Sequence, residues 1–273
     1  MITQATKAIP ATQGTDLEFR LIGEFSWGIV QRSANRTLGR LHFEEFADRG
    51  PSAFLVIEQD LNGTISWLAE AIRLAVDYGF DELKLSRISV RLKVEQISLI
   101  AALEDLGFQV KAKLNQGRKL RLQVDRWGYI AAMAQSMMLE HIEDRSWTFG
   151  FDSGRRRAGL CSYTDKRITV SKYLSLVHKI DDVRQTVIHE IAHAIAGPKE
   201  GHGKKWLSIA RKIGYRNEKY TGEEIAEKYA PYKGVCPNGH SHYRYQKPKR
   251  LYSCNLCGKG FNKDYMIDWL VRS

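Results

Sequence analysis

The chain has 273 residues, of which 43% are hydrophobic and 27% are charged, a composition typical of globular proteins. No apolar run approaches the roughly 20 residues that a membrane-spanning helix needs. The first residues lack the basic stretch and apolar core of a secretory signal, and four cysteines are too few for a disulfide scaffold. We therefore expect a cytoplasmic protein with no membrane partner, and we exclude secreted and fibrous proteins.

The net charge of +11 lies entirely in the second half of the chain. Residues 1–125 contain 16 Lys and Arg and 16 Asp and Glu, which leaves 26 of the 42 basic and 15 of the 31 acidic residues for positions 126–273. This asymmetry predicts two parts with different partners, and the basic part is a candidate for binding nucleic acid. The alternative is a basic protein without a specific partner.

The first 125 residues show alternating strand and helix patterns. The predicted order is strand 53–58, helix 64–78, strand 82–86, helix 94–106, and a hairpin of strands 108–114 and 119–124. Such an order favours an α/β layered domain.

The succession of a helix, YGFDELKL, a second helix and LEDLGFQV resembles the second half of the GNAT acetyltransferase fold. The resemblance places that family's pyrophosphate loop at residues 59–64. Asn62 and Thr64 depart from the family's pattern, so we do not expect acetyl-CoA binding. The open alternatives for this part are acyltransferase activity and a scaffold or adaptor role.

The pattern changes after residue 125. The predicted elements are a helix at 127–142, strands at 147–151 and 167–170 around a polar, Arg-rich turn at 152–157, a helix at 181–196 and a helix at 204–213. For the helix at 181–196, Asp181 or Asp182 is the expected N-cap and Gly197-Pro198 is the expected end.

The motif His189-Glu190-Ile191-Ala192-His193 lies within the helix predicted at 181–196. Residues four apart share one face of a helix, so both histidines can offer imidazole nitrogens to one metal ion. Zinc held in this way keeps an open position for water, whose pKa it lowers toward about 7. Glu190 is placed to act as the general base and then to pass the proton to the leaving amine. The alternative is a helix with two structural histidines.

A third candidate ligand, His202, follows nine residues after His193. The flanking Gly201 and Gly203 allow the sharp turn that would return this imidazole to the metal. The pattern predicts a three-histidine zinc site in a metalloprotease.

The sequences HEIAHA, GP and GHGKKW, preceded by RAGLCSY and ITVSKYL, resemble the SprT family of zinc metalloproteases, which includes the Spartan-type DNA-dependent proteases. The resemblance implies that His189, His193 and His202 bind zinc, that Glu190 is the base, and that Trp206 packs near them. The short gap between His193 and His202 resembles phage-encoded relatives. The resemblance begins at about residue 126.

Three other side chains near these motifs carry weaker expectations. Cys161 is predicted to be a buried strand thiol rather than a nucleophile. Tyr163 and Tyr173 are candidates for stabilising an oxyanion, and the sequence does not choose between them or core packing.

The C-terminal segment contains two short ligand pairs separated by a hairpin-length gap, Cys236 with His240 and Cys254 with Cys257. This spacing predicts a zinc ribbon, and a segment with so little apolar sequence needs such a metal to fold. His242 could replace His240 as the fourth ligand. SprT relatives commonly carry a ribbon here with four cysteines, so the histidine is a departure.

Basic residues alternate with tyrosines between these two pairs. Lys and Arg can neutralise phosphates while aromatic rings stack on bases. The candidate contacts with DNA, expected to have little sequence preference, are Arg244, Tyr245, Lys247, Lys249 and Arg250. The alternative is a solvated hairpin.

The expected fold class is α+β: an α/β domain at 1–125 that could be GNAT-like, an HExxH zincin-type metalloprotease domain at 126–230, and a basic zinc ribbon at 231–273. The expected function is a zinc metalloendopeptidase that cleaves proteins on or near DNA. The alternatives are a nucleic-acid-binding protein with an inactive protease-like domain, and an activity located in the N-terminal domain.

Overall fold

A computed structural model describes residues 9, 16–47, 50–59, 65–155, 157–216 and 230–272. The chain divides into two compact units. The first comprises residues 1–143 and 179–184, and the second comprises residues 144–178 and 185–273. The predicted boundary after residue 125 coincides with the beginning of a helix that belongs to the first unit. Among the helices that the structure describes, none is both long and apolar enough to cross a bilayer.

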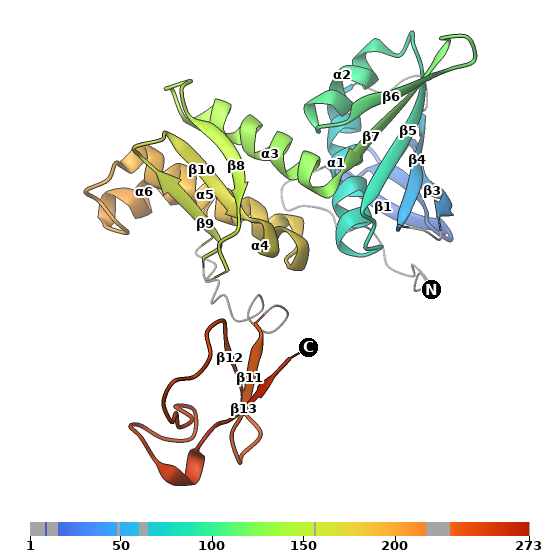
Figure 1. Ribbon diagram of the computed structural model, residues 1–273. Helices are drawn as coiled ribbons and strands as arrows, with labels where there is room; N and C mark the ends of the chain where they lie inside the picture. Colours follow the sequence, from blue (N-terminus) through green and yellow to red (C-terminus); the bar gives the residue numbers. More distant parts are fainter. Residues whose placement is uncertain are drawn as a thin grey trace. The chain divides into compact units, whose positions relative to one another are not determined.

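The first unit contains a seven-stranded sheet with the order β1-β2-β3-β4-β5-β7-β6 (Figure 1). Strands β4 and β5 are parallel, and the other neighbours are antiparallel. The strands are β1 Leu17–Gly23, β2 Ser26–Gln31, β3 Arg36–Ala47, β4 Ser52–Gln59, β5 Arg87–Lys93, β6 Gln109–Leu114 and β7 Lys119–Asp125.

Three helices accompany this sheet: α1 Ile65–Asp81, α2 Ile97–Asp105 and α3 Arg126–His141. Their apolar residues recur at helical spacing and pack with the alternating apolar residues of the strands. The ring of Trp27 from β2 lies 5.1 Å from that of Tyr78 in α1, and the ring of Phe80 lies 5.7 Å from that of Tyr129 in α3. These aromatic contacts join the helices and the sheet into one core.

The predicted helices and the hairpin of the first unit are confirmed, but the strand predicted at 82–86 is wrong. Leu83 and Leu85 are buried, which imitates a strand pattern, yet their amides bond back to the carbonyls of Tyr78 and Gly79 at the end of α1. Lys84 adopts a left-handed φ of 54°. Sheet pairing begins only at Arg87, and the loop predicted at 59–64 lies largely outside the described residues.

The second unit begins with a three-stranded sheet of order β8-β10-β9, in which β10 pairs parallel with β8 and antiparallel with β9. Helix α5 runs across one face of this sheet (Figure 1). The elements are β8 Thr148–Asp152, β9 Gly159–Ser162, β10 Arg167–Ser171, α4 Lys172–Val177, α5 Ile180–Ala196 and α6 Lys204–Lys212. The strands predicted at 147–151 and 167–170 are confirmed, as are both helices.

Helix α5 begins one residue earlier than predicted, so neither Asp181 nor Asp182 is its N-cap. The carboxylate of Asp182 instead accepts a hydrogen bond of 3.1 Å from the backbone N–H of Lys179, which is the glutamate-like half of a capping box. The helix ends as predicted, because Gly197 adopts a φ of 95° that a side chain would disfavour.

The C-terminal segment forms a small antiparallel sheet of order β12-β11-β13, with β11 Tyr232–Val235, β12 Ser241–Arg244 and β13 Asp268–Val271, and a 3-10 turn at Lys263–Tyr265. Gly234 lies at the centre of this sheet, where an added Cβ would approach the Trp269 ring to 2.8 Å. The indole therefore packs directly on the backbone of β11.

Candidate active site

Three histidines converge at the end of α5 and the start of α6. The Nε2 atoms of His189 and His193 lie 3.2 Å apart, and each lies 3.1 Å from Nε2 of His202. Nitrogen ligands about 2.0–2.1 Å from a tetrahedral zinc ion lie about 3.3 Å from one another. The three nitrogens therefore have the spacing that one metal ion requires, and these residues could hold one.

The turn that returns His202 to the helix depends on two glycines in different ways. Gly201 has a φ of 49°, in the left-handed region. Gly203 is the N-cap of α6, and a Cβ there would lie 2.9 Å from the carbonyl oxygen of Glu200. The prediction that the flanking glycines permit this sharp turn is consistent with both observations.

The indole ring of Trp206 packs against all three histidine rings. Its ring centroid lies 4.8 Å from that of His189, 5.2 Å from His193 and 4.7 Å from His202. The indole is buried in a small apolar cluster with Ala192 and other residues of α5 and α6. Because one rigid ring contacts all three imidazoles, it restricts their orientations, in keeping with the packing role predicted for it.

The two motif histidines are held in the neutral form. Burial and the neighbouring imidazoles lower the pKa of His189 and of His193 to about 4. A neutral imidazole has a free ring nitrogen for a metal ion, whereas an imidazolium has none. The site is therefore suited to bind a metal ion at neutral pH.

Glu190 points from α5 toward strand β9 and is only 7% exposed. Burial raises the pKa of its carboxyl to about 7, while the charge of Arg157 and a hydrogen bond from the backbone N–H of Cys161 oppose the shift. A carboxyl with a pKa near neutrality can both accept and release a proton under physiological conditions. This is the property that the predicted general base needs.

Strand β9 touches Glu190 closely at a glycine. A Cβ on Gly159 would lie 2.8 Å from both Cγ and Oε1 of Glu190 and 3.0 Å from the carbonyl oxygen of Thr169. Sequence reasoning missed this residue, since a glycine in a short strand has no signal of its own. Its role becomes visible only when β9 is seen against α5.

The Arg-rich turn between β8 and β9 is organised by Asp152. Its carboxylate accepts hydrogen bonds from Thr169 Oγ1 at 2.6 Å and from Arg157 Nη2 at 3.1 Å. These bonds and the positive charge of Arg157 keep the pKa of Asp152 below its usual value despite burial. The turn therefore contributes both a positive and a negative charge to the surroundings of Glu190.

The remaining candidates of this region have structural contacts. The hydroxyl of Tyr163 donates a 3.0 Å hydrogen bond to the carbonyl of His193, and the hydroxyl of Tyr173 accepts one of 2.7 Å from Arg155. Burial raises the pKa of Cys161 to about 12, and the nearby carboxyl of Glu190 adds to this effect. A thiol with so high a pKa is a poor nucleophile, in keeping with the structural role predicted for it.

The ribbon brings together Cys236, His240, Cys254 and Cys257, whose candidate ligand atoms all lie within 4.8 Å of one another. Sγ of Cys236 lies 3.7 Å from Sγ of Cys257, and Nδ1 of His240 lies 3.2 Å from the latter. Sulfur ligands about 2.3 Å from a tetrahedral zinc ion lie about 3.8 Å apart, so these four residues fit a structural metal site.

The structure distinguishes the two histidines that the sequence left open. His240 contributes Nδ1 to the cluster, 3.5 Å from the Cys236 sulfur and 3.6 Å from the Cys254 sulfur. His242 points its Nε2 at the Cys254 sulfur from 3.2 Å. His240 is therefore placed as the fourth ligand, and His242 as a hydrogen-bonding neighbour of one ligand.

The predicted nucleic-acid contacts do not share one environment. Arg244 ends β12, and its guanidinium lies 4.3 Å from the centroid of the Tyr252 ring. Arg250 lies 5.3 Å from the same ring. Lys247, Lys249 and Arg250 are exposed, whereas Arg244 and Tyr245 are half-buried. The exposed basic residues are thus those of the loop that follows β12.

We compared the sequence with models of protein families and with curated proteins. The SprT-like family model matches residues 130–227. None of the curated proteins compared with this sequence matches it.

Among solved structures, a GNAT-family acetyltransferase from Bacillus anthracis is 17% identical with a TM-score of 0.32, covering 37% of this chain and 66% of its own. The spermidine N-acetyltransferase from Vibrio cholerae in complex with CoA and spermine is 21% identical with a TM-score of 0.35, covering 38% of this chain and 67% of its own. The α+β architecture and the SprT-like resemblance are confirmed: the stretch that matches the SprT-like family model includes His189, Glu190, His193 and His202.

Proposed function

We propose that this protein is a zinc-dependent metalloendopeptidase that cleaves proteins on or near DNA, with DNA–protein crosslinks among its candidate substrates. The observation that carries the proposal is the triangle of Nε2 atoms from His189, His193 and His202, with Glu190 on the same helix. When bound there, a zinc ion supplies Lewis-acid polarisation of the scissile carbonyl and acidifies water.

The chain's own residues supply the proton transfer. Glu190 takes a proton from the attacking water and passes it to the nitrogen of the scissile peptide bond, which leaves as an amine. Burial against Gly159 holds the carboxyl in one position, and the Cys161 N–H orients it. Tyr163 fixes the carbonyl of His193 and thereby the end of the ligand-bearing helix.

Glu190→Gln tests this mechanism. The amide has the shape of the carboxyl but cannot accept the proton, so we expect peptide-bond cleavage to fall by about a thousandfold or more. Zinc content at both sites and binding to DNA should stay unchanged. The measurement is cleavage of an unfolded protein substrate, with elemental analysis of the same samples. Undiminished cleavage by the variant would contradict the assigned role of Glu190.

The localisation on DNA is a separate part of the proposal. Residues 231–273 contain eight basic and two acidic residues, and Lys247, Lys249 and Arg250 are exposed. Neutralising phosphates with such side chains releases counterions, so affinity should fall steeply with salt.

Replacing Lys247, Lys249 and Arg250 with Gln should weaken DNA binding and lower the slope of log affinity against log salt by about 2–3. The matched control replaces Lys111, Lys113 and Lys119, three exposed lysines of the β6–β7 hairpin, with Gln. Equal losses in both triple variants would mean that net charge alone, and not the ribbon loop, is responsible.

Two alternative functions would give different experimental results. A nucleic-acid-binding protein with an inactive protease-like domain would bind DNA and show no cleavage that depends on Glu190. An acyltransferase or adaptor in the N-terminal domain would act independently of His189, and acetyl-CoA binding would identify the acyltransferase.

A further inference from the structure

Helix α5 is shared between the two units. Its first residues, as far as Arg184, belong to the first unit together with residues 1–143, while residue 185 and all that follow belong to the second. The same helix carries His189, Glu190 and His193. What holds its first turn is therefore relevant to the candidate metal site.

The first turn of α5 is capped by a side chain far away in the sequence. Oδ2 of Asp81, the last residue of α1, accepts a 2.8 Å hydrogen bond from the backbone N–H of Ile180. Oδ1 of the same carboxylate accepts a 3.0 Å bond from Arg126 of α3. The first N–H groups of a helix have no partner within it, so a carboxylate at this place satisfies a donor and favours the positive end of the helix dipole.

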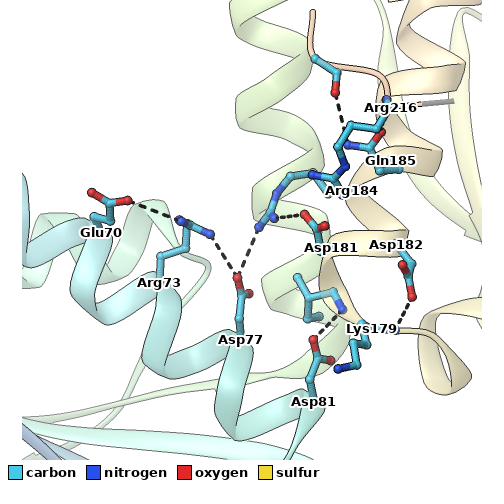
Figure 2. A network of polar contacts seen from close by, with 12 residues as sticks. Glu70, Arg73, Asp77, Asp81, Lys179, Asp181, Asp182, Arg184, Gln185 and Arg216 are labelled. Atoms are coloured by element: carbon cyan, nitrogen blue, oxygen red, sulfur yellow. Dashed lines mark hydrogen bonds and ion pairs between the residues drawn. The ribbon is translucent and has the colours of Figure 1, made fainter. Parts of the chain in front are cut away.

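A second carboxylate on α1 holds the side of the same turn (Figure 2). Asp77 accepts a 2.7 Å bond from the Tyr129 hydroxyl, a 3.1 Å bond from Arg73 and a 3.5 Å contact from Arg184 of α5. Arg184 also bonds to Asp181, one turn back, at 2.9 Å. The Asp77 and Arg184 side chains are only 17% and 20% exposed, so solvent screens this network weakly.

The next residue of α5 makes its contacts within the second unit. Gln185 is buried, and its side-chain amide donates to the carbonyl of Gly214 at 3.3 Å and accepts from the N–H of Arg216 at 2.8 Å. Adjacent residues of one helix are thus fixed by different parts of the chain. His189 follows four residues later, about 6 Å along the helix axis.

We propose that Asp81 and Asp77 are positioning residues for the three-histidine metal site, acting through the first turn of α5. The inference rests on the proposed function only in taking that site to bind zinc. The first unit holds the beginning of the ligand-bearing helix, and without this anchor the first turn frays and the histidines are less well fixed. Asp81 and Asp77 therefore contribute to metal affinity through the helix that carries two of the three histidines.

The test measures how fast each site of the full-length, metal-loaded chain loses its ion to a chelator. Co²⁺ replaces zinc, because its absorption bands distinguish a site of three nitrogens from one with three thiolates. Asp81→Ala should increase the rate of loss from the three-histidine site by about tenfold, within the range found for residues that support metal ligands. The ribbon site, far away in the sequence, is the internal control and should be unaffected.

Asp81→Asn separates positioning from general destabilisation. Its amide oxygen can still accept the Ile180 N–H, so it should restore most of the slow loss even though the ion pair with Arg126 is gone. Glu82→Gln is the matched control, because it removes a largely exposed ion pair with Lys179 at the same turn and should change nothing.

If Asp81→Ala does not fold, Arg184→Met provides a second test of the same anchor. Methionine keeps an unbranched apolar side chain but removes the contact with Asp77. Equal metal loss in wild type, Asp81→Ala and Arg184→Met would overturn the inference while leaving the proposed function intact. Absence of Co²⁺ from the three-histidine site of the wild type would instead overturn the proposed function.

Discussion

At the scale of single residues, the candidate site depends on positions with no chemistry of their own. Gly159 leaves room for the Glu190 side chain, and Trp206 contacts all three histidine rings. Neither residue has a titratable side chain that could transfer a proton to or from a substrate. They determine where the reactive side chains stand.

Gly159→Ala should therefore impair catalysis without removing the metal. The added methyl would lie 2.8 Å from Glu190 and close to the backbone of β10, so the carboxyl must move. Since a shift of about 1 Å in a reacting group can cost a hundredfold in rate, we expect a loss of about that size in kcat. Elemental analysis should still find the metal at the three histidines.

Leu160→Ala on the same strand is the control for this variant. Its side chain is 42% exposed, so truncation leaves little cavity and should leave kcat within about twofold. Full activity of Gly159→Ala would show that Glu190 tolerates displacement.

At the scale of elements, the long helices and several strands, among them β8 and β10, were predictable, whereas the first three strands were not. The helix at α5 could be foreseen because its apolar residues, the Gly197 stop and the spacing of His189 and His193 all agree. No strand was predicted before residue 53, although β1, β2 and β3 form much of the first sheet. These strands pair through short connections, such as the one between Gly23 and Ser26, but their formation depends on packing against cross-strand neighbours, which a single stretch of sequence does not reveal.

The ribbon allows an element-scale prediction. Gly234→Ala would place a methyl group 2.8 Å from the Trp269 ring and against Ile267, which the small sheet β11-β12-β13 cannot accommodate. We expect the variant to lose the ribbon metal while the three-histidine site retains its own. Metal content per chain, measured on wild type and variant, should fall from about two to about one.

Gly239→Ala tests whether any glycine in this segment is equally sensitive. Gly239 has a φ of 82° with open space around it, so alanine there strains only the turn. Full metal content in Gly234→Ala would show that the sheet adjusts without disturbing Cys236 and its partners.

At the scale of the whole molecule, stability has different sources in different parts. The first unit has a large apolar core with residues such as Trp27, Leu41 and Ile72 fully buried. In the ribbon, the most buried side chains include the sulfur ligands Cys236 and Cys254 themselves. Because a segment of this size has so little core, we expect it to depend on a metal ion at this candidate site to remain folded.

Removal of metal should therefore act locally. After treatment with a chelator, amides of β11, β12 and β13 should lose protection against hydrogen exchange, while those of β2, β3 and β4 keep theirs. Mass spectrometry of peptides from the treated and untreated chain measures both regions at once. Preserved protection in β11–β13 would mean that the ribbon folds without metal.

The sequence indicated the candidate ligands of both possible metal sites because ligand spacing along one helix or across one hairpin is a local property. The sequence did not choose between His240, which precedes β12, and His242, which lies in it. Only the fold shows that the His240 ring lies near several cysteine sulfurs, whereas the His242 ring lies near that of Cys254. The carboxylates of Asp77 and Asp81 were not foreseen, because they meet α5 across about a hundred residues of chain.

The division of α5 between the two units also has a consequence for gene fusion. A recombination event that joined residues 144–273 to another gene would transfer both sets of candidate metal ligands but would leave out Asp77 and Asp81. The fusion would contain a helix whose first turn lacks the contacts with Asp81 and Asp77.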